Sequence, residues 1–235
     1  MLTCVLIVAA IAQPSAQGPA AAHPSITEVL YAVPTGAKGD ADKDGTRHAT
    51  GDEFVELANL TPAPINLKGY RLSDGKSVNN APPNAKPKRE EEDGGRFIFT
   101  FPDLVLQPGQ VVVVVNGHKA STPGPVGTEQ SAAAANEHFA GAFVFSRRAE
   151  SPYIGFGNSA DCVLLTAPDG TAVECVRWGD GSKVPDAQAE RTLIAPEGKG
   201  SVQIDKAGGA FVPHTDLPGS DDQTLFSPGR YPGVR

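Results

Sequence analysis

The sequence predicts an all-β protein folded as an immunoglobulin-like β-sandwich, and three observations lead to this prediction. The chain of 235 residues holds 26 glycines and 21 prolines, a composition typical of a protein with many turns. Its apolar residues come in short runs of strand length. Only residues 129–139, with four consecutive alanines, have the composition of a helix, and that helix would be short. Short strands separated by turns are typical of two sheets that share one core.

The expected strands follow one another between turn signals. A run of five valines at 111–115 indicates a strand buried on both faces. Long loops are expected as insertions at 75–95 and 117–139, and no clear linker follows residue 24, so residues 25–235 are expected to form a single domain. The predicted strands are 25–33, 53–59, 65–72, 96–101, 111–115, 142–146 and a hairpin over 162–178, with short edge strands at 201–205 and 210–212.

The first residues resemble an export signal. Residues 2–12 are an apolar run too short to span a bilayer, and Ala10-Ile11-Ala12 fits a signal-peptidase site. We expect a signal peptide over 1–12, cleavage between 12 and 22, and a linker over 13–24. The segment lacks the usual Lys or Arg, so a buried strand or a misplaced start codon stays an alternative. Export implies a secreted, cell-surface or periplasmic protein, and no other segment is long enough for a membrane span.

An acidic loop follows the first strand and has the spacing of a calcium-binding loop. Three aspartates stand at its positions one, three and five, and Gly45 at position six permits a sharp turn. Position twelve is Gly51, where a bidentate Glu is expected, so one of the next two acids would have to replace it. The alternative is a solvated acidic turn. The candidate Ca²⁺ ligands are Asp40, Asp42, Asp44, Thr46 (through its carbonyl), Asp52 and Glu53.

Two cysteines flank a turn inside the predicted hairpin. Signal removal would take Cys4 away and leave Cys162 and Cys175, on either side of Pro168-Asp169-Gly170. A four-residue loop would place the two cysteines directly opposite each other on one face, which permits a disulfide in an oxidising compartment. The alternative is two small apolar residues packed separately.

Charge and motif content exclude several functional classes. A net charge of −7 argues against nucleic-acid binding, because phosphate contacts need clustered basic residues. The five histidines are scattered, without metal-ligand spacing. Asp52 and Glu53 are neighbours on a strand and point to opposite faces, so they do not form an acid–base pair. We therefore expect no catalytic residues and no enzyme activity.

Several motifs together resemble a bacterial lamin tail domain of the exported kind. The resemblance covers roughly residues 25–180 in the order of the family, and the tail from residue 201 to 230 resembles the closing segment of exported members. It implies an immunoglobulin-like β-sandwich without enzyme activity of its own. The motifs lie at residues 26–31, 52–59, 65–74, 106–114, 161–165 and 173–178.

The resemblance implies a secreted module for binding or structural contacts, stabilised by calcium if the acidic loop binds an ion. Its partner would be an unidentified protein or a surface glycan, and a monomer is expected. Two alternatives stay open. One is an accessory domain of an extracellular hydrolase or nuclease, or such an enzyme with an unrecognised site. The other is a carbohydrate-binding module, although one Trp and four Tyr offer few rings for stacking on a sugar.

Overall fold

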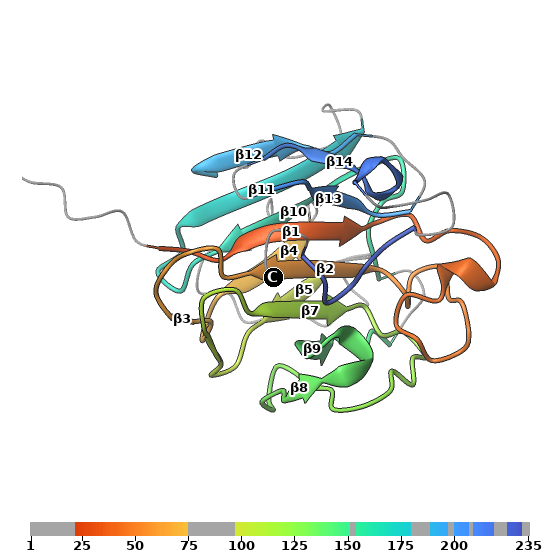
Figure 1. Ribbon diagram of the computed structural model, residues 1–235, viewed down its shortest axis with the longest axis horizontal. Helices are drawn as coiled ribbons and strands as arrows, with labels where there is room; N and C mark the ends of the chain where they lie inside the picture. The colour runs from red at the N-terminus through yellow and green to blue at the C-terminus, as the bar shows by residue number, and fades with distance from the viewer. Residues whose placement is uncertain are drawn as a thin grey trace, which may run out of the picture.

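Two main β-sheets and a two-stranded ribbon make up the structure, a computed structural model (Figure 1). It describes residues 22–74, 97–150, 154–179, 189–196, 200–206, 209–218 and 225–231. The predicted signal peptide, most of the predicted linker and the whole of the predicted 75–95 insertion lie outside these ranges. From the linker, His23 is described, and its Nδ1 shares a hydrogen bond of 2.6 Å with the Tyr70 hydroxyl.

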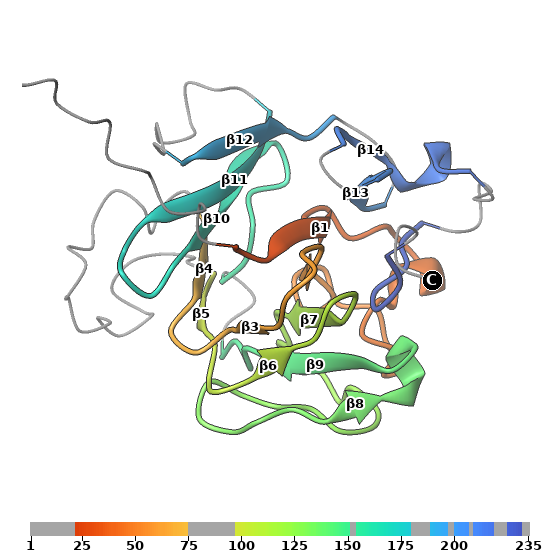
Figure 2. The same ribbon diagram turned by 60° about the vertical axis from the view of Figure 1, so that its left-hand side comes forward.

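The larger sheet has seven strands and draws on both ends of the chain. The strand that starts the domain lies between the next strand of the chain and a strand from its C-terminal part (Figures 1 and 2). In order across the sheet the strands are β14 (Phe211–Pro213), β13 (Val202–Ile204), β1 (Ser25–Leu30), β2 (Phe54–Ala58), β7 (Val111–Val115), β9 (Ala142–Ser146) and β8 (Ala135–Asn136).

The second sheet has five strands and is built around the predicted hairpin. Its last strand joins β11 in parallel and was not expected from the sequence. In order the strands are β12 (Arg191–Ile194), β11 (Ala172–Gly179), β10 (Ala160–Thr166), β4 (Arg71–Asp74) and β5 (Ile98–Thr100); the ribbon pairs β3 (Ile65–Asn66) with β6 (Val105–Leu106). The predicted all-β sandwich is confirmed.

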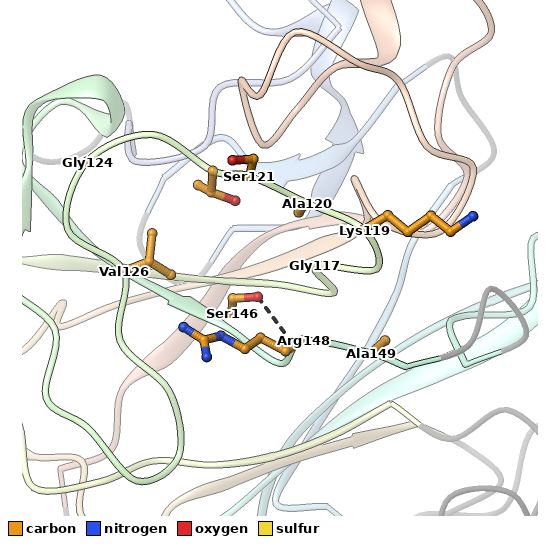
Figure 3. Close-up of a pocket in the computed structure, with 10 residues that line it drawn as sticks. Gly117, Lys119, Ala120, Ser121, Gly124, Val126, Ser146, Arg148 and Ala149 are labelled. Carbon is orange, nitrogen blue, oxygen red and sulfur yellow. Dashed lines mark hydrogen bonds between the residues drawn. The ribbon is translucent and has the colours of Figure 1, made fainter.

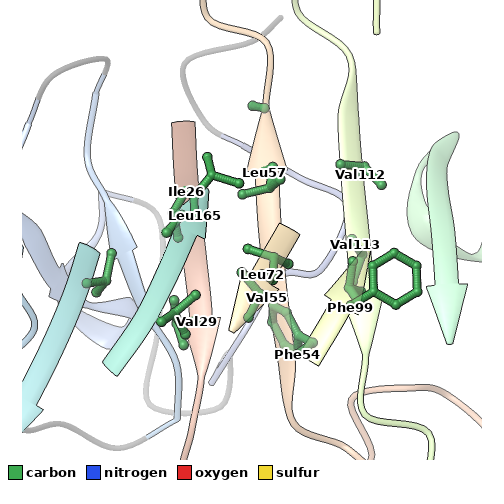
Figure 4. Close-up of a cluster of buried hydrophobic side chains, with 14 of the residues drawn as sticks. Ile26, Val29, Phe54, Val55, Leu57, Leu72, Phe99, Val112, Val113 and Leu165 are labelled. Atoms are coloured by element: carbon green, nitrogen blue, oxygen red, sulfur yellow. The ribbon is translucent and has the colours of Figure 1, made fainter. Parts of the chain in front are cut away.

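The core lies between the two sheets and is strongly apolar (Figure 4). Val29 and Val55 of the larger sheet belong to the same buried cluster as Leu72 and Leu165 of the second. At one end of the core the Trp178 ring stacks on Tyr31, with 4.2 Å between the ring centroids. The valine run was predicted correctly, because all five residues of β7 are buried between β2 and β9. Burial of this much apolar surface supplies most of the driving force for folding.

The helix predicted over residues 129–139 is wrong. Residues 135–136 form β8, and residues 137–139 form a single 3₁₀ turn. The Asn136 side chain caps this turn by accepting a hydrogen bond of 3.0 Å from the His138 N–H. Ala140 then takes a left-handed conformation that ends the turn. The alanine run favours a helix by propensity, but it has no apolar stripe to bury, so packing does not support one.

A C-terminal segment, residues 225–231, covers two glutamates that face each other across β1 and β2. Glu28 pairs with Glu56 in the strand register, and neither side chain is exposed. Glu28 accepts hydrogen bonds from the Ser227 N–H at 2.9 Å and from the side chains of Ser201 and Gln203. Glu56 accepts one from the Gly229 N–H at 2.8 Å. The two carboxyl groups thus hold the segment on the sheet.

The environment of this pair favours the protonated form of both groups. Burial raises the pKa of Glu28 to about 7, although its hydrogen bonds with Ser201 and Ser227 lower it in part. Burial and the nearby charge of Glu28 raise the pKa of Glu56 well above its usual value. Since the pKa values are higher in the folded state than in the unfolded chain, this pair stabilises the fold below about pH 4.5. That contribution is lost as the pH rises through about 7.

We therefore expect Glu56→Gln to weaken the dependence of stability on pH. A glutamine can still accept from the Gly229 N–H and donate to Thr27 Oγ1, but it carries no charge to repel Glu28. Between pH 5 and pH 8 the unfolding free energy from urea titration should fall less in the variant than in the wild type, by on the order of 1–3 kcal/mol. Glu137→Gln, at an exposed position, should leave the wild-type dependence unchanged. An identical fall of the unfolding free energy in Glu56→Gln and in the wild type would show that the Glu28–Glu56 pair does not cause the pH dependence.

Candidate metal centre

The loop between β1 and β2 brings three aspartates together. Asp40, Asp42 and Asp44 each offer a carboxylate oxygen, and these oxygens lie within 4.8 Å of one another. Among the described residues this is the one group of three or more potential metal ligands so close together. The predicted alternate spacing thus does gather carboxylates. Oxygen donors of this kind are the ligands that Ca²⁺ prefers in proteins.

Short-range hydrogen bonds curl the loop around these carboxylates. Asp40 accepts from the N–H groups of Asp44 and Gly45, at 3.1 and 3.0 Å. Asp42 also accepts from the Asp44 N–H, and Asp44 accepts from Thr46. Gly45 has a φ of 89°, a left-handed conformation that a side chain would strain. The aspartates therefore shape the turn themselves, as such residues often do.

Asp52 supports the loop from inside the protein. Its Oδ1 accepts from the N–H groups of Ala41 and Asp42, at 2.6 and 3.0 Å, and its Oδ2 accepts from the His48 N–H at 2.6 Å. The side chain is fully buried. Burial raises its pKa, and the three backbone donors lower it in part. With both oxygens engaged by backbone, Asp52 acts here as a positioning residue behind the three aspartates.

Asp42 is the residue of the cluster whose side chain has a buried oxygen without a hydrogen-bond partner. It is 1% exposed, and its Oδ2 has no hydrogen-bond partner. Burial, followed by the negative charge of Asp52, raises its pKa to about 8. A buried carboxylate oxygen without a donor destabilises the folded state, and a bound cation would offset that cost. The residues present therefore fit a divalent cation with oxygen ligands.

Two of the predicted ligands, Glu53 and Thr46, are not part of the group of three aspartates. The Glu53 carboxylate lies apart from the loop: its Oε2 accepts from the Phe156 N–H at 3.0 Å. Burial raises its pKa well above the usual value, and the charges of Asp161 and Asp74 add to the shift. The structure therefore does not place Glu53 with the aspartates. Thr46 is exposed on the loop beside Asp44, to which its N–H is bonded.

The acidic loop is also fastened to neighbouring segments. Asp44 Oδ2 accepts from the Ser121 N–H at 3.0 Å. The Lys43 amino group lies over the Phe139 ring, 4.5 Å from its centroid, and donates to the His138 carbonyl. On the other side the Arg47 guanidinium donates to the carbonyls of Val33 and Pro34. The loop is thus held by long-range contacts as well as by its own turns.

The predicted register of the cysteine hairpin is wrong. Cys162 lies opposite Arg177, and Cys175 lies opposite Leu164, so the cysteines are diagonal neighbours rather than directly opposed. The turn at 168–170 is tighter than the four-residue loop that was expected, and a β-bulge beside Thr166 inserts an extra residue into β11. Diagonal positions have Cα atoms about 7–8 Å apart, beyond the usual range for a disulfide.

Both cysteines are free, buried thiols on the same face of the second sheet. A hydrogen bond with Cys175 raises the pKa of the Cys162 thiol, and burial raises it further. The disulfide stays a prediction, and its formation would require the backbone to shift toward a closer pairing.

We expect Asp52→Asn to destabilise the protein even without any metal. The amide would present an N–H₂ group to backbone N–H donors in a buried place, so the unfolding free energy in EGTA should fall by about 1–3 kcal/mol. Denaturant titration measures this directly. Asp103→Asn, which removes an exposed acid from a distant turn, should leave the stability within about 0.5 kcal/mol of the wild type. Equal effects from the two variants would exclude the supporting role of Asp52.

We also expect both thiols to be protected in the native state. Because Cys162 and Cys175 are 0% and 1% exposed, a thiol reagent should label them only at the rate at which the protein unfolds. The Cys4→Ser variant limits the assay to these two residues. Fast labelling of the native protein would contradict their burial, and failure to label the unfolded protein without reductant would instead establish a disulfide.

Comparison with known proteins agrees with this architecture. The family model named Lamin Tail Domain matches residues 17–180. A search of curated proteins found no match. In the part of the chain that the structure describes, no helix is both long enough and apolar enough to cross a membrane. The match covers more than half of the sequence and agrees with the observed sandwich, so the chain belongs to the lamin tail domain family, a family of structural immunoglobulin-like domains.

Proposed function

We propose that this chain is a secreted, non-enzymatic lamin tail module for binding or structural contacts, and that its acidic loop binds Ca²⁺. The single observation that carries the calcium proposal is the buried Asp42 oxygen, which has no hydrogen-bond partner and belongs to the three-carboxylate group. The membership of a structural domain family supports a contact role rather than catalysis.

The charges in the loop favour a divalent cation. Three carboxylates within 4.8 Å repel one another when all are ionised, and two positive charges placed among them remove that repulsion. Ca²⁺ accepts six to eight oxygens in a flexible arrangement, including backbone carbonyls and water, whereas Mg²⁺ requires a nearly ideal octahedron. A loop with three aspartates and the exposed residue Thr46 beside them suits Ca²⁺ better.

An extracellular location is consistent with such a site. The apolar run at residues 2–12 and the possible cleavage site after it support export. Sites with dissociation constants of about 0.1–1 mM are common in extracellular modules, where a weak calcium site suffices. Bound calcium would fix the acidic loop and its contact with Ser121, and thereby one end of the sandwich. The partner would be a protein or a surface glycan.

The test is thermal unfolding in EGTA and in millimolar Ca²⁺, with Mg²⁺ for comparison. An ion that binds only the native state stabilises it by about 2.7 kcal/mol at a hundredfold excess over Kd, so the wild-type Tm should rise by several degrees. Asp42→Asn should make this rise smaller, because a neutral amide oxygen binds Ca²⁺ less strongly than a carboxylate. In EGTA at pH 9 the same variant should be at least as stable as the wild type. The pKa of Asp42 is about 8, so at pH 9 the wild type carries a buried negative charge that the variant lacks.

Two variants serve as matched controls. Glu53→Gln removes a carboxylate that lies apart from the loop, and Asp103→Asn removes an exposed one. Both should keep the wild-type rise in Tm with Ca²⁺. A rise of full wild-type size in Asp42→Asn, or no rise in the wild type, would refute the calcium site and leave the contact module without a metal.

A further inference from the structure

A cavity lies next to the acidic loop, between the segment after β7 and the segment after β9 (Figure 3). Its volume is about 580 Å³, enough for a small ligand. It is bordered by small and polar residues, namely Gly117, Lys119, Ala120, Ser121, Thr122, Gly124, Val126, Ser146, Arg148 and Ala149.

The charge of this cavity is opposite to that of the whole protein. The chain carries a net charge of −7, yet the charged side chains at the cavity are Lys119 and Arg148, and no acidic residue is among the described residues that line it. Ser121, Thr122 and Ser146 contribute hydroxyl groups. The Thr122 Oγ1 atom is buried and has no hydrogen-bond partner. Cationic groups and hydroxyl donors are together suited to an anion with oxygen acceptors.

The two basic residues hold costly backbone conformations. Lys119 has a φ of 57° and Arg148 a φ of 52°, and both belong to a group of four such non-glycine residues in the described part of the chain. A left-handed conformation is unfavourable for a residue that has a Cβ atom. Two such residues, 29 positions apart in sequence, border one cavity. Strain of this kind is concentrated at ligand sites more than elsewhere.

The walls of the cavity are held in place by hydrogen bonds of several side chains. The Asn136 amide donates to the carbonyls of Pro123 and Pro125, at 2.8 and 3.0 Å. Asp44 of the acidic loop accepts from the Ser121 N–H. Ser146 Oγ accepts from the Arg148 N–H at 3.1 Å, the dashed line in Figure 3. A site held in this way needs little ordering when a ligand binds.

We propose that this cavity binds a small oxyanion, a sulfate or phosphate group, either free or carried on a larger molecule. Arg148 supplies the main charge: in Figure 3 its side chain extends toward Val126, whereas the Lys119 side chain extends the opposite way. The guanidinium group suits such an anion because it can donate two parallel hydrogen bonds to it. Ser121 and Ser146 supply hydroxyl contacts. The proposal does not depend on bound calcium.

The test is a titration of the protein with sodium sulfate and with sodium phosphate, followed through amide NMR signals. Sodium chloride keeps the ionic strength constant, and EGTA removes calcium so that the result is independent of the acidic loop. The N–H signals of Gly117, Ser121 and Arg148 should shift and reach saturation. Arg148→Asn should weaken binding at least tenfold. Asparagine tolerates the left-handed conformation, so this variant should fold with an unchanged or higher Tm.

Lys68→Asn is the matched control, because it removes one exposed positive charge from a distant turn. It should leave binding within twofold of the wild type. Shifts that never saturate, or equal weakening in both variants, would overturn the proposal. A sulfated disaccharide is titrated in parallel. If it binds more tightly than inorganic sulfate, the proposed ligand is the anionic group of a glycan; equal or weaker binding identifies the free ion.

Discussion

The burial of β2 on both faces is the constraint on which the rest of the structure depends. One face packs into the core between the sheets, and the other is covered by the C-terminal segment, where the Phe226 ring meets Phe54 edge to face. Glu56 on that second face must therefore share a buried space with Glu28. Asp52 and Glu53, just before β2, are buried as well. Their carboxylates therefore need hydrogen-bond donors from the backbone.

Buried acids serve different purposes in this molecule, and their partners distinguish them. Asp52 is satisfied by three backbone N–H groups and shapes the acidic loop. Glu28 and Glu56 hold a distant segment of chain in place. Asp42 alone in its cluster keeps a buried oxygen without a donor, which marks it as the member that a cation would complete. The sequence pattern alone does not distinguish these roles, because a motif shows which acids are close in the sequence but not which hydrogen bonds they make.

Local patterns predicted local features well and failed where distant segments decide the outcome. The valine run of β7 and the alternate aspartates are patterns of adjacent residues, and the strand and the carboxylate group that they predict are both present. The hairpin register depended on a bulge beside Thr166 that carries no signature of its own. The alanine run was assigned to a helix because propensity cannot show that no apolar face is available. The cavity could not be predicted, since Lys119 and Arg148 border the same cavity only after β7 and β9 pair.

The position of β13 bears on where this domain ends as an independent folding unit. The family match stops at residue 180, yet β13 pairs with β1 in the larger sheet, and β12 extends the second sheet. A chain cut at that boundary would leave β1 as an open edge with unpaired backbone groups, available to the edge of another molecule and thus to aggregation. The region that the family model matches is therefore shorter than the stretch of this chain that is needed to keep β1 paired on both sides.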